Sequence, residues 1–250
     1  MEKVFCIIPA RYGSTRAQGK LLRKILDKPL IQWVWLNASK ISSFSDIFIA
    51  TDSEEIENSI KKFGGKIIRT SSLHKCGTDR IAEAARILNL ADEDIIVNIQ
   101  ADEPLISSLS VESLVSSLRK SGIIDMATLA YQSSNIKEFQ NSNTVKVVVN
   151  NNNFALYFSR SQIPFYNGEK QDDFVFLKHL GIYAYKMDFL QKIAALPVSL
   201  LEEKEKLEQL RALDNDYKIK TVISSFDSQS VNTEEDFKTV ENLLQMQIRK

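Results

Sequence analysis

A group of basic residues follows the first apolar segment, in the stretch PARYGSTRAQGKLLRK. The basic side chains are Arg11, Arg16, Lys20, Arg23 and Lys24, and no acidic residue occurs between Lys3 and Asp27. Gly13 and Gly19 allow backbone N–H groups to approach phosphate oxygens, while Arg and Lys neutralise phosphate charge. A solvated basic loop is the alternative, but a position directly after a strand favours a polyphosphate site. The stretch matches neither GxxxxGK[ST] nor GxGxxG, which disfavours P-loop ATPases and NAD enzymes.

Carboxylates follow another apolar run, DIIVNIQADEP. Gln100, Asp102 and Glu103 come where this strand is expected to end, at the same edge of the sheet as the basic loop. Mg²⁺ bound beside phosphates commonly takes one or two protein carboxylates. Acidic residues at a strand end are also ordinary turn formers, so the segment leaves a metal site and a turn equally open.

Three further segments carry polar side chains. HKCGTDR leads from His74 into a helix that Thr78 could cap, which would offer free N–H donors to an anion. In KHLGIYAYK, alternation puts His179 and Tyr183 on one face, where they could meet a sugar or form a half-buried structural pair. LLEEKEKLEQLRAL is expected to form one amphipathic helix, whose Glu208 and Gln209 face a ligand or water.

The first half of the chain alternates strands and helices. Strands are expected at residues 4–10, 47–51, 66–70 and 94–100, and helices at 30–38, 54–63 and 78–88. Apolar runs separated by amphipathic helices indicate a parallel sheet buried on both faces. This half predicts a Rossmann-like α/β arrangement.

The second half contains alternating segments, which indicate antiparallel or mixed strands. Strands are expected at 126–132, 144–150, 153–159, 178–186 and 218–224, with helices at 188–195, 200–213 and from 233. No repeat or long linker divides the chain. We therefore expect a single domain over 1–250, with a nucleotide-binding half (1–122) and a sugar-binding and dimerisation half (123–250).

The composition excludes several classes of protein. The 250 residues include 32 Lys plus Arg and 32 Asp plus Glu, so no global charge favours nucleic acid or an anionic membrane. Cys6 and Cys76 cannot form a disulfide framework, and Cys76 has no evident partner that would make it a nucleophile. With no export signal or apolar membrane segment, the cytoplasm is the expected location.

Eight segments together resemble the 3-deoxy-manno-octulosonate cytidylyltransferases, the CMP-Kdo synthetases. The segments are PARYGSTR with GK, HKCGTDR, IVNIQADEP, VKVVV, ALYFSRSQIP, KHLGIYAYK, LEQLR and VNTEEDF. Their order and spacing match the family over nearly the whole chain. The resemblance implies a three-layer α/β nucleotide-diphospho-sugar transferase fold with an inserted antiparallel or mixed β layer. It also implies a homodimer in lipopolysaccharide biosynthesis that uses Mg²⁺, CTP and a Kdo-type sugar acid.

The same resemblance implies roles for individual residues. The nucleotide-binding set is Arg11, Ser14, Arg16, Lys20, Cys76, Gly77, Arg80 and Gln100, and the sugar-binding set is Gln100, His179, Tyr183, Glu208 and Gln209. Arg11, Lys20 and Asp102 would be catalytic, and Asp102 and Asn232 would bind the metal. Phosphoryl-type transfer needs charge neutralisation and positioning more than a protein nucleophile, in agreement with the basic loop.

Departures from the family pattern leave a rival open. Asn232 stands where the family has a second metal-binding aspartate, so Mg²⁺ affinity should fall, although Asn232 with Glu235 could instead cap the last helix. The altered metal edge suggests a variant sugar such as 8-amino-Kdo. It equally suggests a CTP-binding homologue with lost or altered catalysis.

Overall fold

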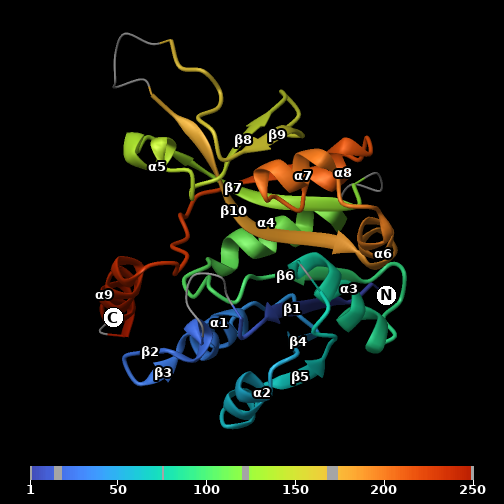
Figure 1. Cartoon of the computed structure of the whole chain (residues 1–250), viewed down its shortest axis with the longest axis vertical. Helices are drawn as coiled ribbons and strands as arrows, with labels where there is room; N and C mark the ends of the chain where they lie inside the picture. Colours follow the sequence, from blue (N-terminus) through green and yellow to red (C-terminus); the bar gives the residue numbers. More distant parts are fainter. Residues whose placement is uncertain (1, 14–18, 75, 120–123, 168–173, 249–250) are drawn as a thin grey trace.

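A computed structural model describes residues 2–13, 19–74, 76–119, 124–167 and 174–248. Nine strands of these ranges form one sheet, whose path is β11-β7-β10-β6-β1-β4-β5, with β8 pairing β10 and β9 pairing β8. Figure 1 shows β1, β4 and β5 in one part of the view and β7 to β10 in the other. The fold is a mixed α/β arrangement of the Rossmann-like kind that the sequence predicts.

The first half supplies the parallel part of the sheet. Its strands are β1 (Val4–Ala10), β4 (Asp46–Thr51), β5 (Lys66–Arg69) and β6 (Ile95–Asn98), and its helices are α1 (Leu30–Ala38), α2 (Glu54–Lys61), α3 (Gly77–Ile87) and α4 (Ser108–Arg119). A one-turn helix η1 (Lys20–Leu22) and a small hairpin, β2 (Lys24–Ile25) and β3 (Lys28–Pro29), separate β1 from α1. The expected parallel strands are confirmed, because β1 pairs in parallel with both β4 and β6.

The second half extends the same sheet with strands of mixed direction. Its elements are β7 (Met126–Ser133), α5 (Ile136–Gln140), β8 (Lys146–Val149), β9 (Ala155–Ser159), β10 (Phe176–Lys186), α6 (Met187–Ala195), α7 (Leu200–Glu205), α8 (Leu210–Asp214), β11 (Lys220–Ser224) and α9 (Glu234–Ile248). Strand β10 runs antiparallel to β6, β7 and β8, whereas β11 is parallel to β7.

Helices cover both faces of the sheet. Alternate residues of β1 enter different apolar clusters: Cys6 and Ile8 pack with α1, α2, α4 and α9, and Phe5 and Ile7 pack with α3, α6 and α8. A strand buried on both faces reads as a continuous apolar run, which is why VFCIIPA has no polar alternation. The two buried faces hold β1 rigidly, so the loop that follows it starts from a fixed point.

Three local predictions were wrong. The expected helix at 200–213 is broken at Lys206, whose φ of 56° is left-handed and ends α7. Thr78 does not cap α3, because Cys76 holds the cap position, and the Cys76 side chain accepts no hydrogen bond from the first turn. The last helix is capped by Thr233 and Asp236, and not by Asn232 with Glu235. The N–H of Thr233 donates to the Asp236 carboxylate, and the N–H of Asp236 donates to the Thr233 hydroxyl.

None of the helices in the part of the chain that the structure describes is both long and apolar enough to cross a membrane.

Candidate active site

The basic loop after β1 returns onto its own start. The backbone N–H of Gly19 donates to the carbonyl of Tyr12 at 3.3 Å, and Gly19 has a left-handed φ of 73°, a conformation that favours glycine. Ser14 and Arg16 lie outside the described residues. The return at Gly19 starts η1 with Lys20, and so fixes where the lysine side chain leaves the backbone.

Arg23, farther along the basic stretch, serves the fold. Its guanidinium makes an ion pair with Glu234 of α9 and lies 4.0 Å from the ring centroid of Phe237. The basic residues thus have different roles. Arg23 binds α9, whereas Lys20 points toward the edge of the sheet at Asp102.

Lys20 lies where three oxygen atoms converge. Its Nζ is 2.8 Å from Oδ2 of Asp102, 2.8 Å from the carbonyl oxygen of Val231 and 3.4 Å from Oδ1 of Asn232. Asp102 follows β6, whereas residues 231 and 232 precede α9. The structure therefore brings Lys20 of the basic stretch into contact with Asp102, which follows β6, and with Asn232, which replaces the family's aspartate.

Backbone contacts hold Asn232 at this point. The N–H of Val231 donates to the carbonyl of Asp102 at 2.9 Å, and the N–H of Asn232 donates to Oδ2 of Asp236 at 2.8 Å. The Asn232 side-chain amide donates to Oγ of Ser230 at 3.0 Å, which directs its oxygen toward Lys20. The cap of α9 thus positions Asn232.

The oxygens around Lys20 suit a divalent cation. A carboxylate, an amide oxygen and a backbone carbonyl are hard ligands of the kind that Mg²⁺ accepts, with its other positions left to water and substrate. Across the described ranges, no three His, Cys, Asp or Glu side chains gather as a metal site made of protein alone. The residues present fit a cation shared with a phosphate ligand.

Five of the predicted nucleotide-binding residues line one cleft of about 140 Å³. Its lining consists of Pro9, Arg11, His74, Cys76, Gly77, Arg80, Gln100 and Glu208. The cleft lies where β1 and β6 end and α3 begins, the edge of an open α/β sheet at which ligands bind. The structure therefore brings together residues that the sequence separates by almost ninety positions.

Glu208 lines this cleft and bonds to the start of α3. Its carboxylate accepts from the backbone N–H groups of Gly77 at 3.1 Å and Thr78 at 3.0 Å, and from the Thr78 hydroxyl at 2.7 Å. It occupies the N-terminus of α3, where negative charge is favoured by the helix dipole. Burial, with the nearby Glu208 charge, raises the pKa of the Cys76 thiol, so this cysteine stays protonated.

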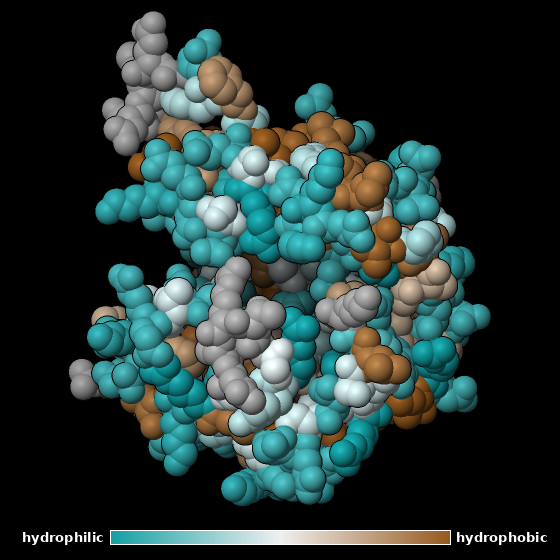
Figure 2. Space-filling model, viewed as in Figure 1, coloured by the Kyte–Doolittle hydropathy of each residue, from teal (hydrophilic) through white to brown (hydrophobic). Residues whose placement is uncertain are grey.

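A larger cavity of about 480 Å³ begins at Asn232. Its lining consists of Glu103, Glu138, Asn141, Asn143, Thr144, Val145, Lys178, His179, Leu180, Gly181, Ser228, Gln229, Ser230, Asn232, Thr233, Glu235 and Asp236. Figure 2 shows the molecular surface hollowed between its upper and lower parts, with hydrophilic side chains around the hollow. Because Asn232 belongs to both the cavity lining and the Lys20 contact, the cavity adjoins the proposed phosphate site.

The predicted sugar-binding residues do not all meet in this cavity. His179 lines it, but its Nε2 is 2.9 Å from Oγ1 of Thr128, and burial lowers its pKa to about 3, so its ring is neutral. Tyr183 is buried, and Gln209 has a side-chain nitrogen with no partner among the described residues. Gln100 lies near Gly181, which places it between the cleft and the cavity.

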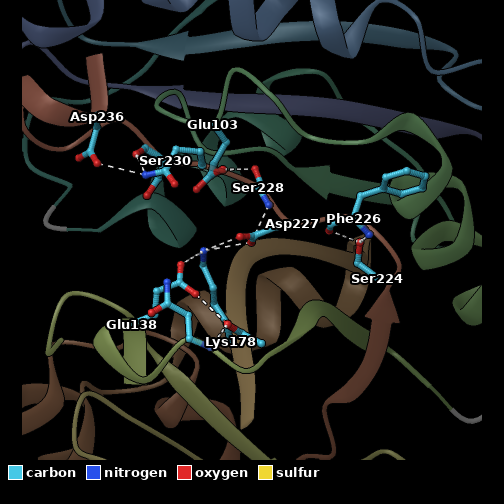
Figure 3. Close-up of polar contacts among 12 residues, drawn as sticks. Glu103, Glu138, Lys178, Ser224, Phe226, Asp227, Ser228, Ser230 and Asp236 are labelled. Carbon is cyan, nitrogen blue, oxygen red and sulfur yellow. Dashed lines mark hydrogen bonds and ion pairs between the residues drawn. The ribbon is translucent and has the colours of Figure 1, made fainter. Parts of the chain in front are cut away.

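Sequence reasoning missed the charged wall of the cavity. Lys178 of β10 donates to Glu138 of α5 at 2.7 Å and to Asp227 at 3.0 Å, and Ser228 bonds to the buried Glu103 (Figure 3). Burial, together with the neighbouring Asp102, raises the pKa of Glu103 to about 8. The alternating pattern around Lys178 indicates a strand with a polar face. It does not predict that the partners of Lys178 are residues 40 and 49 positions away.

A basic loop facing a carboxylate at the carboxyl edge of an α/β sheet is the arrangement of enzymes that bind nucleotides. The sequence profile of the family described as Cytidylyltransferase matches residues 5–219. This chain belongs to that family and is a nucleotidyltransferase; its members generally use a divalent metal.

Curated relatives cover almost the whole chain. An 8-amino-3,8-dideoxy-manno-octulosonate cytidylyltransferase of Shewanella pealeana is 49% identical over 239 residues, which are 95% of this chain and 97% of that protein. The enzyme of the same name from Shewanella baltica is 47% identical, over 96% of this chain and 98% of that protein.

A solved structure has the same fold over the same extent. CMP:2-keto-3-deoxy-manno-octonic acid synthetase complexed with CTP superposes with a TM-score of 0.89 at 39% identity, covering 98% of this chain and all of that one. A cytidylyltransferase of Leptospira borgpetersenii, 20% identical with a TM-score of 0.66, covers 98% of this chain and 88% of that one and shares the fold.

Proposed function

We propose that this enzyme transfers CMP from CTP to 8-amino-3,8-dideoxy-manno-octulosonate. The observation that supports this substrate most directly is the 47–49% identity, over 95% or more of the chain, to enzymes named for it. The structural likeness to a synthetase complexed with CTP supports the nucleotide. Kdo, with a hydroxyl in place of the 8-amino group, is the second sugar to test.

The proposed reaction is a displacement at phosphorus. The anomeric hydroxyl oxygen of the sugar bonds to the α-phosphorus of CTP, and the bond from that phosphorus to the oxygen that bridges to the β-phosphorus breaks. Pyrophosphate leaves with that oxygen, and the hydroxyl proton passes to water. Such a transition state is stabilised by positioning and by neutralising charge on the phosphate oxygens. Arg11 and Lys20, which approach the cleft and the Asp102 edge, would supply that positive charge.

We propose Mg²⁺ as the divalent cation, with Asp102 and Asn232 as its protein ligands. Bound there, it would polarise phosphate oxygens and screen their charge from the attacking hydroxyl. Lys20 would then leave these oxygens and bind the triphosphate, since an ammonium and a dication cannot share one set of ligands. Asn232 supplies an oxygen without a charge, which predicts a higher cation requirement than an aspartate would give.

Pyrophosphate release tests this function. The purified protein is supplied with CTP, Mg²⁺ and either 8-amino-Kdo or Kdo, and Asp102→Ala serves as the variant that should lose turnover while keeping its circular dichroism spectrum. Asn232→Asp should lower the Mg²⁺ concentration at half-maximal rate. Turnover by Asp102→Ala would remove this carboxylate from the reaction.

The rival is a CTP-binding homologue with lost or altered catalysis, and the specific observation in its favour is Asn232. It predicts that CTP binds, measured by calorimetry, while neither sugar yields pyrophosphate with any divalent cation. Either outcome separates the two functions.

We further propose that the protein is a homodimer, as the family resemblance implies, and that it is located in the cytoplasm. Light scattering after gel filtration tests the first, since a dimer has twice the mass of the chain. Fractionation of the producing cells tests the second.

A further inference from the structure

The cavity that Asn232 lines also has charged side chains in its lining. Asn232, whose Oδ1 is 3.4 Å from Nζ of Lys20, lines it, and so do Glu138 of α5 and Asn143, which follows α5. Its lining includes four carboxyl groups, of Glu103, Glu138, Glu235 and Asp236, but Lys178 is the one Lys or Arg among the described lining residues. The cavity therefore favours a ligand that brings positive charge.

Two of these carboxyl groups are already committed. Asp236 accepts from the backbone N–H groups of Asn232 at 2.8 Å and Thr233 at 2.7 Å, and from the side chain of Gln229 at 3.1 Å. Glu103 is only 6% exposed, and its Oε2 already accepts from Oγ of Ser228. Neither is free to balance a charge on the ligand.

The group formed by Lys178, Glu138 and Asp227 carries a net negative charge. One ammonium lies between two carboxylates, 2.7 Å from Oε1 of Glu138 and 3.0 Å from Oδ2 of Asp227, as Figure 3 shows. The side chain of Lys178 is 12% exposed and both contacts raise its pKa against the effect of burial, so it remains charged. With two anionic partners, Lys178 is poorly placed to bind the carboxylate of a sugar acid.

Glu138 is the carboxylate of this group that lines the cavity. Its other oxygen, Oε2, accepts from Oγ of Ser133 at 2.8 Å, so two side chains fix its orientation. A carboxylate oxygen has more than one lone pair, so each can accept a further bond. Glu138, whose orientation is fixed by Ser133 and Lys178, can therefore accept a bond from a second ammonium without moving.

We propose that Glu138 binds the 8-ammonium group of the sugar and makes the enzyme prefer the 8-amino sugar over Kdo. The inference rests on the proposed function, because the relatives named for an 8-amino sugar point to the ligand. A primary amine is protonated at pH 7, like that of Lys, and its bond to a carboxylate is charge-assisted, whereas the hydroxyl of Kdo forms a neutral-donor bond. The ammonium would bring the Lys178 group to electrical neutrality.

Steady-state kinetics with both sugars test the proposal. For the wild type, we expect kcat/KM for 8-amino-Kdo to exceed that for Kdo by tenfold or more. Glu138→Gln keeps the shape and the bond from Ser133 but removes the charge, so kcat/KM for the amino sugar should fall about tenfold while that for Kdo changes less than threefold. A structural defect would lower both values together.

Glu235→Gln is the matched control. Glu235 is an exposed carboxylate of the same cavity, and the two carboxylates bonded to Lys178 in the described part of the chain are those of Glu138 and Asp227. Neutralising Glu235 should therefore leave the ratio of the two kcat/KM values unchanged. Thermal unfolding and CTP binding confirm that each variant is folded.

Two results would overturn the proposal. The first is that the wild-type enzyme has equal kcat/KM values for the two sugars. The second is that a folded Glu138→Gln variant keeps the wild-type ratio of kcat/KM for 8-amino-Kdo to kcat/KM for Kdo. Failure of the wild type to release pyrophosphate with either sugar would instead contradict the proposed function.

Discussion

Lys20 joins the oxygen atoms of the candidate cation site. Its ammonium neutralises Asp102 and satisfies Val231 and Asn232 at a place where only 10% of its side chain is exposed. Two cations held by the same oxygens repel each other strongly at such short distances. Lys20 and a divalent cation should therefore compete.

Lys20→Met should increase the affinity for Mn²⁺ in the absence of nucleotide by about tenfold, within the range typical of coupled binding sites. The measurement is the free Mn²⁺ signal in electron paramagnetic resonance, which needs no turnover. Lys24→Met, an exposed lysine of β2, is the control and should leave the affinity unchanged. Equal affinity in wild type and Lys20→Met would show that the lysine does not block the cation.

Glu103 links the site to the pH dependence of stability. Burial is the main reason that its pKa rises from 4.5 to about 8, so between these values the folded protein holds a proton that the unfolded chain has lost. The free energy of unfolding therefore falls as pH rises through this window, by at most about 1.4 kcal/mol per pH unit.

Glu103→Gln should remove that slope. We expect the variant to be more stable than the wild type at pH 8 by an amount on the order of a few kcal/mol, and the difference to shrink toward pH 5. Urea unfolding at several pH values measures both curves. Parallel curves would mean that Glu103 is already ionised near neutral pH.

At the scale of elements, Lys146 of β8 ties a loop to the sheet beside the cavity. Its ammonium donates to the carbonyls of Asn141 at 3.0 Å, Thr144 at 2.8 Å and Arg160 at 2.8 Å, and burial, with the charge of Arg160, lowers its pKa. Asn141 and Thr144 line the cavity. One side chain thus fixes the turn between α5 and β8.

Lys146→Met should destabilise the protein by about 2–4 kcal/mol, because three carbonyls lose their donor in a buried place. Lys137→Met, an exposed lysine of α5, should change stability by about 0.5 kcal/mol or less. Chemical unfolding compares the two. If Lys146→Met lost no more stability than Lys137→Met, water would be shown to replace the ammonium as the donor to the three carbonyls.

β10 is the element that sequence periodicity describes only in part. Its two faces are as expected, with Leu180 and Ile182 in one apolar cluster and Tyr183 in the other. The pairing with β7 shifts between His179 and Tyr183, where Gly181 has a left-handed φ of 70°. A glycine that permits a bulge cannot be told from any other glycine without knowing the partner strand.

At the scale of the molecule, the cleft joins segments from distant parts of the chain. Arg11 follows β1, Gln100 follows β6 and Glu208 lies between α7 and α8. A ligand that touches all of them must lose these contacts when the chain unfolds. Its binding free energy therefore stabilises the whole fold.

CTP with Mg²⁺ at about 100 times its Kd should stabilise the folded state by roughly 2.7 kcal/mol. For a chain of this size, that corresponds to a rise in Tm of about 5–10 °C. Differential scanning calorimetry measures the shift, with ATP as the control for base selectivity. An equal shift with both nucleotides would assign the affinity to the triphosphate alone.

The sequence by itself determined four strands and three helices of the first half, the basic loop and the carboxylates that follow β6, but not α4 or the hairpin of β2 and β3. It did so because strand burial and local charge leave patterns within a few consecutive residues. The family pattern also identified residues of one cleft, although Ser14 and Arg16 lie outside the described residues.

Only the tertiary structure decided which groups meet. Lys20 bonds to Asp102 and Asn232, which are 82 and 212 positions away, Glu208 covers the N-terminus of α3, and Lys178 lies between Glu138 and Asp227. The partner of a charged side chain depends on distance and burial in the folded chain, and neighbouring residues in the sequence predict neither of these quantities. For the same reason, the left-handed residue Lys206 interrupts a helix whose apolar spacing is unbroken.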